Sequence, residues 1–371
     1  MRKVCLILMI CLICLSAAGC AVTGEVENQA YALVMGVDDR DGGIGLTIRI
    51  PRIGQGGGDD GKSGGQGEPY LVISASGDDY AQALEHLQWA TARELNLSHL
   101  RLLVVSEALS TQERFPGLIR AVAETRHLYT TAGFIVCEGR AQSFIEGQET
   151  LLGSHLSSDI DAMFRHYAAH GFIPAATVAD LYYASDACYS DPVGVWGFPD
   201  TGEKPAAAII EADESTLNDI TRTASSRQYL GAALFRNGRL IGRLDGPETL
   251  CYNLLTRRVD TFSFESGGRA WTLSSALPTR LSVAFDGNSA RLLADVRLSC
   301  ADAGDLSGLE ADIARDLKAL ILRCQALGVE PFGFAEKAVA RFLTLGEWLA
   351  CDWRSRFSGA EIDVSVHISS P

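Results

Sequence analysis

The sequence predicts a multi-domain α+β fold, a mixed α/β arrangement whose mostly antiparallel sheets pack against helices. Short apolar strands alternate with amphipathic helices between residues 31 and 139. An Asn-Gly hairpin and further strands with alternating faces occupy residues 229–300. An amphipathic helix then covers 307–327, and a strand closes the chain. A length of 371 residues accommodates two or three domains.

The first twenty residues are predicted to be a targeting segment. Arg2 and Lys3 precede VCLILMICLICLSAAGC, an apolar run ending in small residues, which is the layout of a secretory signal. The run is short for a spanning helix, which needs about 20 apolar residues. Small residues before Cys20 are typical of the bacterial lipobox, although Ala17 stands where most lipoboxes carry Leu. We therefore expect a lipoprotein signal peptide at 1–19 and lipid attachment at Cys20; the alternative is an ordinary secreted protein.

The charge balance argues against several partners. The chain has 32 Lys and Arg against 46 Asp and Glu, a formal net charge of −14 at pH 7. Nucleic-acid binding depends on basic residues that neutralise phosphates, so we expect no nucleic-acid partner. A basic patch on anionic lipid is disfavoured for the same reason. The predicted acyl chains would therefore hold the body at a membrane without spanning it.

Six of the ten cysteines lie beyond Cys20. They are widely spaced and include no C-x-x-C pair, which disfavours zinc sites and thioredoxin-like chemistry. An exported protein can form disulfides, whereas a free buried cysteine packs as a small apolar residue. The sequence leaves both states open for Cys137, Cys188, Cys251, Cys300, Cys324 and Cys351.

The first half is expected to form an α/β layer. The strands YALVMGVD and IGLTIRI flank the turn DDRDGG. DDYAQALEHLQWATAREL is expected to be a helix capped by Asp78, because its apolar residues recur at helical spacing. The nearly continuous apolar run LRLLVVSE is typical of a strand in the middle of a sheet. Further elements are a strand at 70–77, a helix at about 112–124 and a strand at 132–139.

Residues 141–200 are expected to add the short helices FIEGQETLL, SDIDAMFRHYAAHG and ATVADLYYASD, and to end in the loop PVGVWGFPD. The composition then turns polar, which predicts a linker at 201–227. The predicted N-terminal α/β domain is therefore 20–200, with room for a small helical subdomain at about 141–200. The predicted C-terminal α+β domain is 228–371.

The second half opens with YLGAALFRNGRLIGRLDG, a strand, an Asn-Gly turn and a second strand. WTLSSA, TRLSVAFDG and SARLLADVRLSC continue as strands. The helix at 307–327 is expected to end at Gly328, and a further helix at about 334–350 precedes the final strand at 361–369. The apolar side of the long helix consists of Leu309, Ile313, Leu317, Leu320, Ile321, Cys324 and Leu327.

Residues 56–63, GGGDDGKS, fit the phosphate-loop pattern G-x-x-x-x-G-K-[ST]. A working phosphate loop joins a buried strand to a helix whose N–H groups face the phosphates. Here GGQGEPY follows and cannot begin a helix, and Asp59 and Asp60 would place carboxylates beside a triphosphate. We expect a flexible connection between strands and no nucleotide cofactor.

Two groups of residues could suggest a metal. His166 and His170 are four apart, but HYAAH lacks the Glu of H-E-x-x-H, and His155 is the nearest further candidate ligand. The aspartates of the first turn lack the spacing of a calcium loop and are assigned to the turn itself: Asp38, Asp39 and Asp41. We therefore expect no metal. The sequence also has no G-x-S-x-G motif, and we expect no catalytic site and no enzyme activity.

Aromatic residues near the C-terminal helix permit two interpretations. Trp348, Trp353 and Phe357 could form a surface for a partner, because aromatics are enriched at interface cores. A helix also needs an apolar face in order to pack. The sequence favours the core interpretation.

Several long stretches are similar to one family. They are ALVMGVDDRDGGIGLTIRIP, YLVISASGDDYAQALEHL, SHLRLLVVSEAL, GAALFRNGRLIGRLDGPET and GLEADIARDLKALILRCQALGVEPFGFAEK. Together they resemble the C subunit of spore germinant receptors, the Ger(x)C or GerAC-type lipoproteins. In the third stretch Ser98 and Ser106 replace family glycines, while His99 and Glu107 match. The Trp-Asp that commonly follows the lipidated cysteine in the family is absent from AVTGEVEN.

The resemblance implies a non-enzymatic, lipid-anchored subunit of a nutrient germinant receptor. Its partners would be the integral membrane A and B subunits, and it would lie on the outer face of the inner spore membrane. The resemblance assigns no germinant to this chain. The alternatives are a solute-binding lipoprotein of a membrane transporter and a surface-anchored enzyme; the first usually repeats similar α/β lobes around a cleft.

Overall fold

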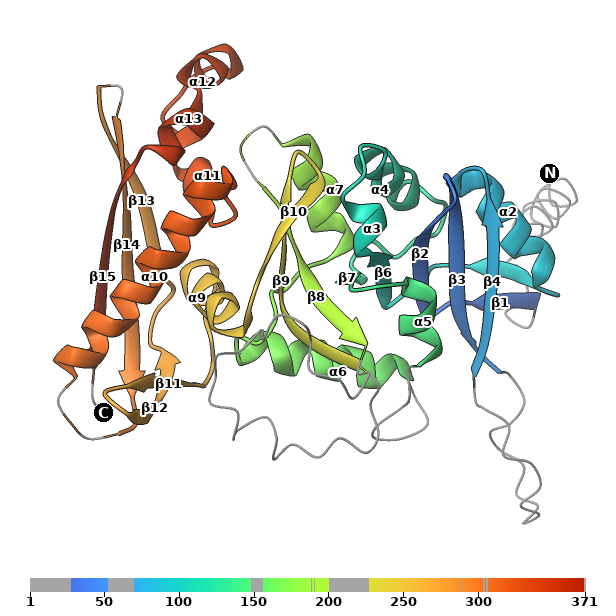
Figure 1. Ribbon diagram of the computed structural model, residues 1–371, viewed down its shortest axis with the longest axis horizontal. Coiled ribbons are helices and arrows are strands. Elements are labelled where there is room, and N and C mark those ends of the chain that lie inside the picture. Colours follow the sequence, from blue (N-terminus) through green and yellow to red (C-terminus); the bar gives the residue numbers. More distant parts are fainter. Residues whose placement is uncertain are drawn as a thin grey trace, which may run out of the picture.

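Two β-sheets of different size form the body of the protein in the computed structural model (Figure 1). The structure describes residues 28–52, 70–147, 156–187, 189, 191–199, 227–287, 289–302, 304 and 306–369. The first sheet has eight strands, and the second has five. They lie side by side along the long axis of the molecule, with the first sheet nearer the N-terminal end (Figure 1). The predicted α+β class is confirmed.

The eight-stranded sheet is mixed. Its four central strands, β2, β6, β7 and β8, run parallel, and an antiparallel pair of strands extends it at each side. In spatial order the strands are β10 (Arg239–Leu244), β9 (Arg227–Arg236), β8 (Val193–Pro199), β7 (Gly133–Cys137), β6 (Leu102–Ser106), β2 (Val34–Arg40), β3 (Gly43–Pro51) and β4 (Tyr70–Gly77). A separate parallel pair joins β1 (Gln29–Tyr31) to β5 (Glu94–Asn96).

Helices cover both faces of this sheet, which explains the continuous apolar run in β6. Alternate residues point to opposite sides, so Leu103 and Val105 belong to one core while Leu102 and Val104 belong to the other. The first core contains residues of α2 (Tyr80–Ala90), α3 (Glu107–Ser110), α4 (Phe115–Ala123) and α7 (Val178–Asp186). The second contains residues of α5 (Ala141–Glu146) and α6 (Leu156–Ala169).

The stretch PVGVWGFPD, expected to be a loop, is the buried strand β8. Glycine and proline weaken local strand propensity, but β7 and β9 supply hydrogen bonds on both sides. A Cβ at Gly194 would lie 2.8 Å from the Phe134 ring, and one at Gly197 would lie 3.1 Å from Ile135 and Phe144. The glycines therefore leave room for large neighbouring side chains.

The hairpin β9–β10 completes this same sheet by pairing with β8. Its turn contains Asn237 and Gly238, both with positive φ, as the Asn-Gly signal predicts. The eight-stranded sheet thus uses strands from both sides of the predicted linker at 201–227. The domain division at that linker stays a prediction.

The five-stranded sheet and its helices make up the rest of the second half. Its strands pair in the order β11-β12-β14-β13, and β15 runs parallel to β14. Their bounds are β11 (Phe262–Ser266), β12 (Arg269–Ser275), β13 (Arg280–Asp286), β14 (Ser289–Cys300) and β15 (Glu361–Ser369). The helices are α9 (Gly246–Thr256), α10 (Ser307–Leu327), α11 (Phe334–Val339), α12 (Leu345–Cys351) and α13 (Trp353–Ser358).

The long helix α10 confirms the prediction from its apolar stripe. Six of the seven stripe residues are buried, Leu327 is partly buried, and Gly328 ends the helix at φ 66°. The buried amide of Gln325 donates to the carbonyls of Phe357 and Ala360, at 2.6 and 3.1 Å. These bonds attach α10 to the chain that enters β15.

Three helix predictions were wrong in extent. The helix expected at FIEGQETLL begins earlier, at Ala141, and ends at Glu146. The helix expected at 78–95 ends at Ala90, and Asp79 rather than Asp78 caps it by accepting from the Gln82 N–H at 2.8 Å. The helix expected at 334–350 is two helices, because a capping box of Thr344 and Glu347 starts α12 separately.

Candidate functional site

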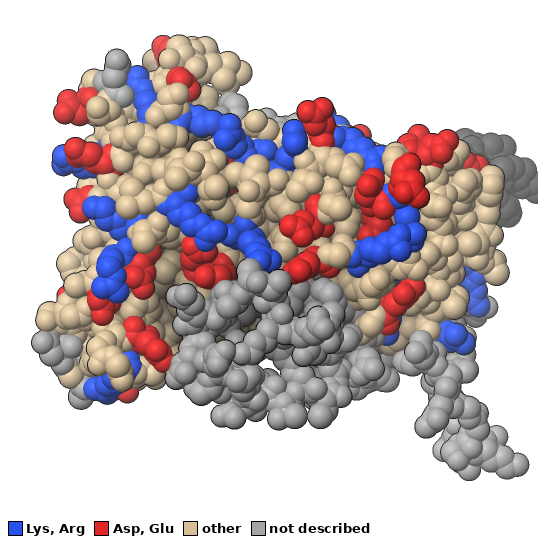
Figure 2. Space-filling model, viewed as in Figure 1, with Lys and Arg blue, Asp and Glu red and all other residues tan. Residues whose placement is uncertain are grey.

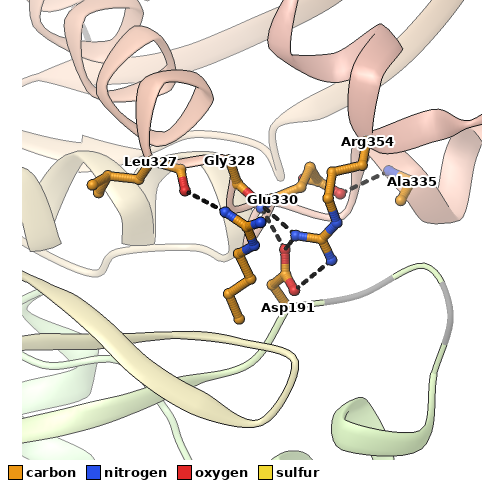
Figure 3. Close-up of polar contacts among 7 residues, drawn as sticks. Asp191, Leu327, Gly328, Glu330, Ala335 and Arg354 are labelled. Atoms are coloured by element: carbon orange, nitrogen blue, oxygen red, sulfur yellow. Dashed lines mark hydrogen bonds and ion pairs between the residues drawn. The ribbon is translucent and has the colours of Figure 1, made fainter. Parts of the chain in front are cut away.

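A cluster of polar side chains joins the first sheet to the second half of the chain (Figure 3). Asp191 lies just before β8, Glu330 lies between α10 and α11, and Arg354 lies in α13. Asp191 and Glu330 are both only 6% exposed. We call these three residues the acidic joint.

Glu330 is held by the backbone that follows it. Gly328 and Gly333 both have positive φ and bend the chain around its carboxylate. One carboxylate oxygen accepts three N–H bonds at 3.0 to 3.1 Å, and the other accepts one at 2.9 Å. The donors are Phe332, Gly333, Phe334 and Ala335.

Burial raises the pKa of Glu330 from 4.5 to about 7, and the four backbone N–H donors offset part of that rise. Burial dominates because no basic side chain contacts the carboxylate among the residues that the structure describes. The carboxyl therefore titrates within the physiological range.

Asp191 connects this loop to the first sheet. Its carboxylate accepts from the Glu330 N–H at 2.9 Å and from the two terminal nitrogens of Arg354 at 3.3 and 3.2 Å. Arg354 also donates to the Gly328 carbonyl at 2.7 Å. A bidentate pair with one buried member fixes orientation as well as distance. The joint can thus fix the segment before β8 against the loop between α10 and α11 and against α13 (Figure 3).

Arg236, at the end of β9, adds a further bond by donating to the Leu327 carbonyl at 3.3 Å. A small cavity of about 160 Å³ lies beside the joint, with Trp348, Trp353 and Phe357 in its wall. These aromatics are 2%, 8% and 1% exposed and belong to the core of the second half, which confirms the core interpretation.

Sequence reasoning missed the joint. Glu330 stands in the quoted stretch GVEPFGFAEK, but nothing local indicates what its carboxylate contacts. Asp191 is 139 residues away and was expected at the edge of a loop. Only the pairing of β8 into the sheet brings the two together.

The predicted lipid site, Cys20, and the stretch GGGDDGKS at 56–63 lie outside the described residues, as does His155. The rings of His166 and His170 have centroids 4.5 Å apart, and His170 Nδ1 lies 2.7 Å from the Thr261 carbonyl oxygen. Within the described ranges, no group of three or more His, Cys, Asp or Glu could hold a metal.

The three aspartates of the first hairpin have separate roles, so their common assignment to the turn was wrong. Asp41 is in the turn, with φ 45°. Asp39 pairs with Arg114, which also donates to the Gly42 carbonyl at 2.6 Å. Asp38 is 2% exposed and accepts from the N–H groups of Ala141 and Gln142, at 2.7 and 2.9 Å. Asp38, in β2, therefore caps the N-terminal end of α5 although the two lie far apart in the sequence.

We expect Asp38→Ala to lower the free energy of unfolding by about 2 kcal/mol, since it removes the cap and leaves buried N–H groups unpaired. Urea unfolding followed by circular dichroism measures the change. The matched control is Asp41→Gly, which should cause no loss, because glycine adopts positive φ readily. Equal losses in both variants would contradict the capping role.

Five of the six cysteines beyond Cys20 are buried: Cys137, Cys251, Cys300, Cys324 and Cys351. Burial raises the pKa of Cys251 and of Cys324 to about 12, so both stay protonated at neutral pH. They pack as small apolar residues. Cys188 lies outside the described residues. Among the described helices, none is both long and apolar enough to cross a membrane.

Residues 23–193 match the family described as spore germination protein N-terminal domain. This part of the chain is therefore similar to the N-terminal domain of spore germination proteins. The match extends through β2 to β7 and both layers of helices, and it ends at the first residue of β8. The matched residues therefore include Asp191 of the acidic joint.

Sequence similarity to germination proteins also extends beyond residue 193. The chain is 21% identical to YfkR of Bacillus subtilis strain 168, whose name assigns it provisionally to spore germination, over 95% of this chain and 92% of that protein. It is 27% identical to spore germination protein KC of the same organism over 36% of this chain and 34% of that protein. The resemblance to GerAC-type C subunits is confirmed.

The fold also has a solved counterpart. The crystal structure of the GerBC protein matches with a TM-score of 0.53 and 10% identity, covering 90% of this chain and 96% of that one. This likeness concerns the fold and extends across both sheets.

Proposed function

We propose that this protein is a non-enzymatic, lipid-anchored subunit of a nutrient germinant receptor that triggers spore germination. The observation that carries the proposal is the germination-protein domain, which begins at residue 23, directly after the candidate lipid site Cys20. The likeness to YfkR along 95% of the chain supports a role for the whole body.

Chain geometry limits how far the body can stand from the membrane. A fully extended chain spans at most about 3.3–3.6 Å per residue, so Cys20 and the start of β1 at Gln29 can be separated by only about 30 Å. An acyl anchor at Cys20 would keep the first sheet close to the outer face of the inner spore membrane.

Surface charge supports a lipid anchor over electrostatic adsorption. The net charge is −14. On the face drawn in Figure 2, acidic side chains lie among the basic ones, so that face presents no continuous basic surface to anionic lipid. Stable anchoring would then depend on the acyl chains.

The lipid anchor is tested by metabolic labelling with a clickable fatty acid. We expect the wild-type protein to be labelled and to sediment with membranes. Cys20→Ala should remove the label and weaken sedimentation, because one attachment site would carry the acyl chains. Label that survives the substitution would contradict the assignment of Cys20.

Complex membership is tested by co-purification from spore membranes. We expect two integral membrane proteins, the A and B subunits, to accompany the tagged wild-type chain. Spores without the gene should lose germination in at least one nutrient. Recovery of a permease and an ATPase instead would favour the transporter interpretation.

A further inference from the structure

We propose that the cavity between α6, the start of β7 and the end of α9 binds a small carboxylate with an apolar body. The cavity has a volume of about 440 Å³, within the range of small-molecule sites. It lies at the opposite end of β7 from the Asp38 cap of α5. The inference goes beyond the receptor role and does not depend on it.

The charges around this cavity are predominantly basic. Three arginines line it, Arg101, Arg165 and Arg257, with Asp161 as the one carboxylate among its described lining residues. This is unusual in a chain of net charge −14. Such a concentration of guanidinium groups favours an anion.

Asp161 does not satisfy all three arginines. Its side chain lies 3.5 Å from Arg101, and both partners are partly exposed, at 33% and 42%. Arg101 also lies over the Tyr129 ring, 5.6 Å from its centroid. Arg165 donates from Nε to the backbone oxygen of Asp161 at 3.2 Å. The Asp161 carboxylate therefore pairs with Arg101 rather than with Arg165 or Arg257.

Arg257 has an unused donor. Its Nη1 is buried and has no hydrogen-bond partner in the part of the chain that the structure describes. Burial lowers the pKa of Arg257, and the nearby Tyr252 and Asp260 offset part of that effect. A charged group that is partly removed from water is costly, and a carboxylate bound in the cavity that Arg257 lines would offset that cost.

The fold holds Arg257 in place. It ends α9, where its backbone N–H donates to the Asn253 carbonyl at 2.9 Å. The buried Asn253 amide donates to the carbonyls of Gly171 and Ile173, at 3.0 and 3.1 Å. α9 is thereby attached to the loop after α6, so the backbone that carries Arg257 is positioned before any ligand arrives.

The remaining wall is apolar and selects the rest of the ligand. A guanidinium matches a carboxylate through two parallel N–H bonds. Hydrocarbon next to that carboxylate would be removed from water against the wall, whereas an inorganic anion would leave the wall unfilled. The apolar wall consists of Ala132, Ile160, Phe164, Ala168 and Ala176.

The test uses two probes that differ only in charge. The full chain, in nonionic detergent, is titrated calorimetrically with 3-phenylpropionate and with 3-phenylpropionamide. We expect saturable binding of the carboxylate and at least about tenfold weaker binding of the amide, because charge-assisted hydrogen bonds are the stronger ones. Absence of saturable binding in the millimolar range, or equal affinity for both probes, would overturn the proposal.

Substitutions of Arg257 test whether the carboxylate binds in this cavity. Arg257→Gln should weaken carboxylate binding by at least about tenfold, whereas Arg257→Lys, which keeps the charge but loses the fork, should weaken it less. The control Arg140→Gln removes the same charge from an exposed position beyond the other end of β7 and should bind like wild type. Equal weakening by Arg257→Gln and the control would refute the site. If Arg257→Gln fails to fold, the comparison of the two probes on wild type decides.

Discussion

Asp191→Ala should lower the free energy of unfolding by about 3 kcal/mol. The substitution removes the acceptor for the buried Glu330 N–H and both bonds to Arg354. The loss is kept moderate because the Arg354 side chain is 43% exposed and water can hydrate it. Urea unfolding monitored by tryptophan fluorescence measures the change, since Trp348 and Trp353 lie beside the joint.

The matched control is another acid that pairs with arginine but lies at the surface. Glu361 contacts Arg291 at 2.9 Å, with side chains 72% and 59% exposed. Glu361→Ala should cost no more than about 1 kcal/mol, because exposed ion pairs contribute little. If the two substitutions cost the same, burial at the joint has no special effect on stability.

The ionisation of Glu330 alone should lower the free energy of unfolding by about 3 kcal/mol as the pH rises from 4.5 to 8. The unfolded chain releases this proton near pH 4.5, whereas the folded protein holds it up to about pH 7. Between these values the unfolded state binds fewer protons, so the free energy of unfolding decreases with pH. Below pH 4.5 the contribution is fully present, and above about pH 7 no more is lost. Each pKa unit corresponds to about 1.4 kcal/mol.

Glu330→Gln isolates this effect from other titrating groups. Glutamine keeps the shape and can accept the three N–H bonds made to one oxygen, although its Nε2 cannot accept from the Ala335 N–H, and it does not ionise. We expect the variant to match wild type within about 1 kcal/mol near pH 4.5 and to be the more stable protein at pH 8. Denaturant unfolding across this pH range measures both curves. Parallel pH curves would show that Glu330 does not carry the dependence.

The acidic joint and the arginine cavity lie in two places where the halves of the chain meet. The joint uses Asp191 before β8 and Glu330 after α10. The cavity uses Arg257 at the end of α9, together with Arg101 before β6. A carboxylate bound between the arginines would add a contact between the halves, which β8 and β9 already join within one sheet, and ionisation of Glu330 would alter the joint.

Local patterns determined much of the secondary structure. The stripe in α10 and the turn at Asn237 depend on residues within a few positions of one another, and both were predicted correctly. The small residues before Cys20 led to the anchor prediction by the same kind of local reasoning. The resemblance to germinant receptor C subunits was also available from the sequence.

The tertiary structure alone decided how distant segments meet. PVGVWGFPD has weak strand propensity and becomes β8 because β7 and β9 pair with it and its glycines admit Phe134 and Phe144. The contact of Asp191 with Glu330 spans 139 residues, and Arg257 reaches a cavity built mainly from residues before position 180. Local propensity and burial patterns specify which face of an element is apolar. They do not specify which element will cover it, and that choice creates both the joint and the cavity.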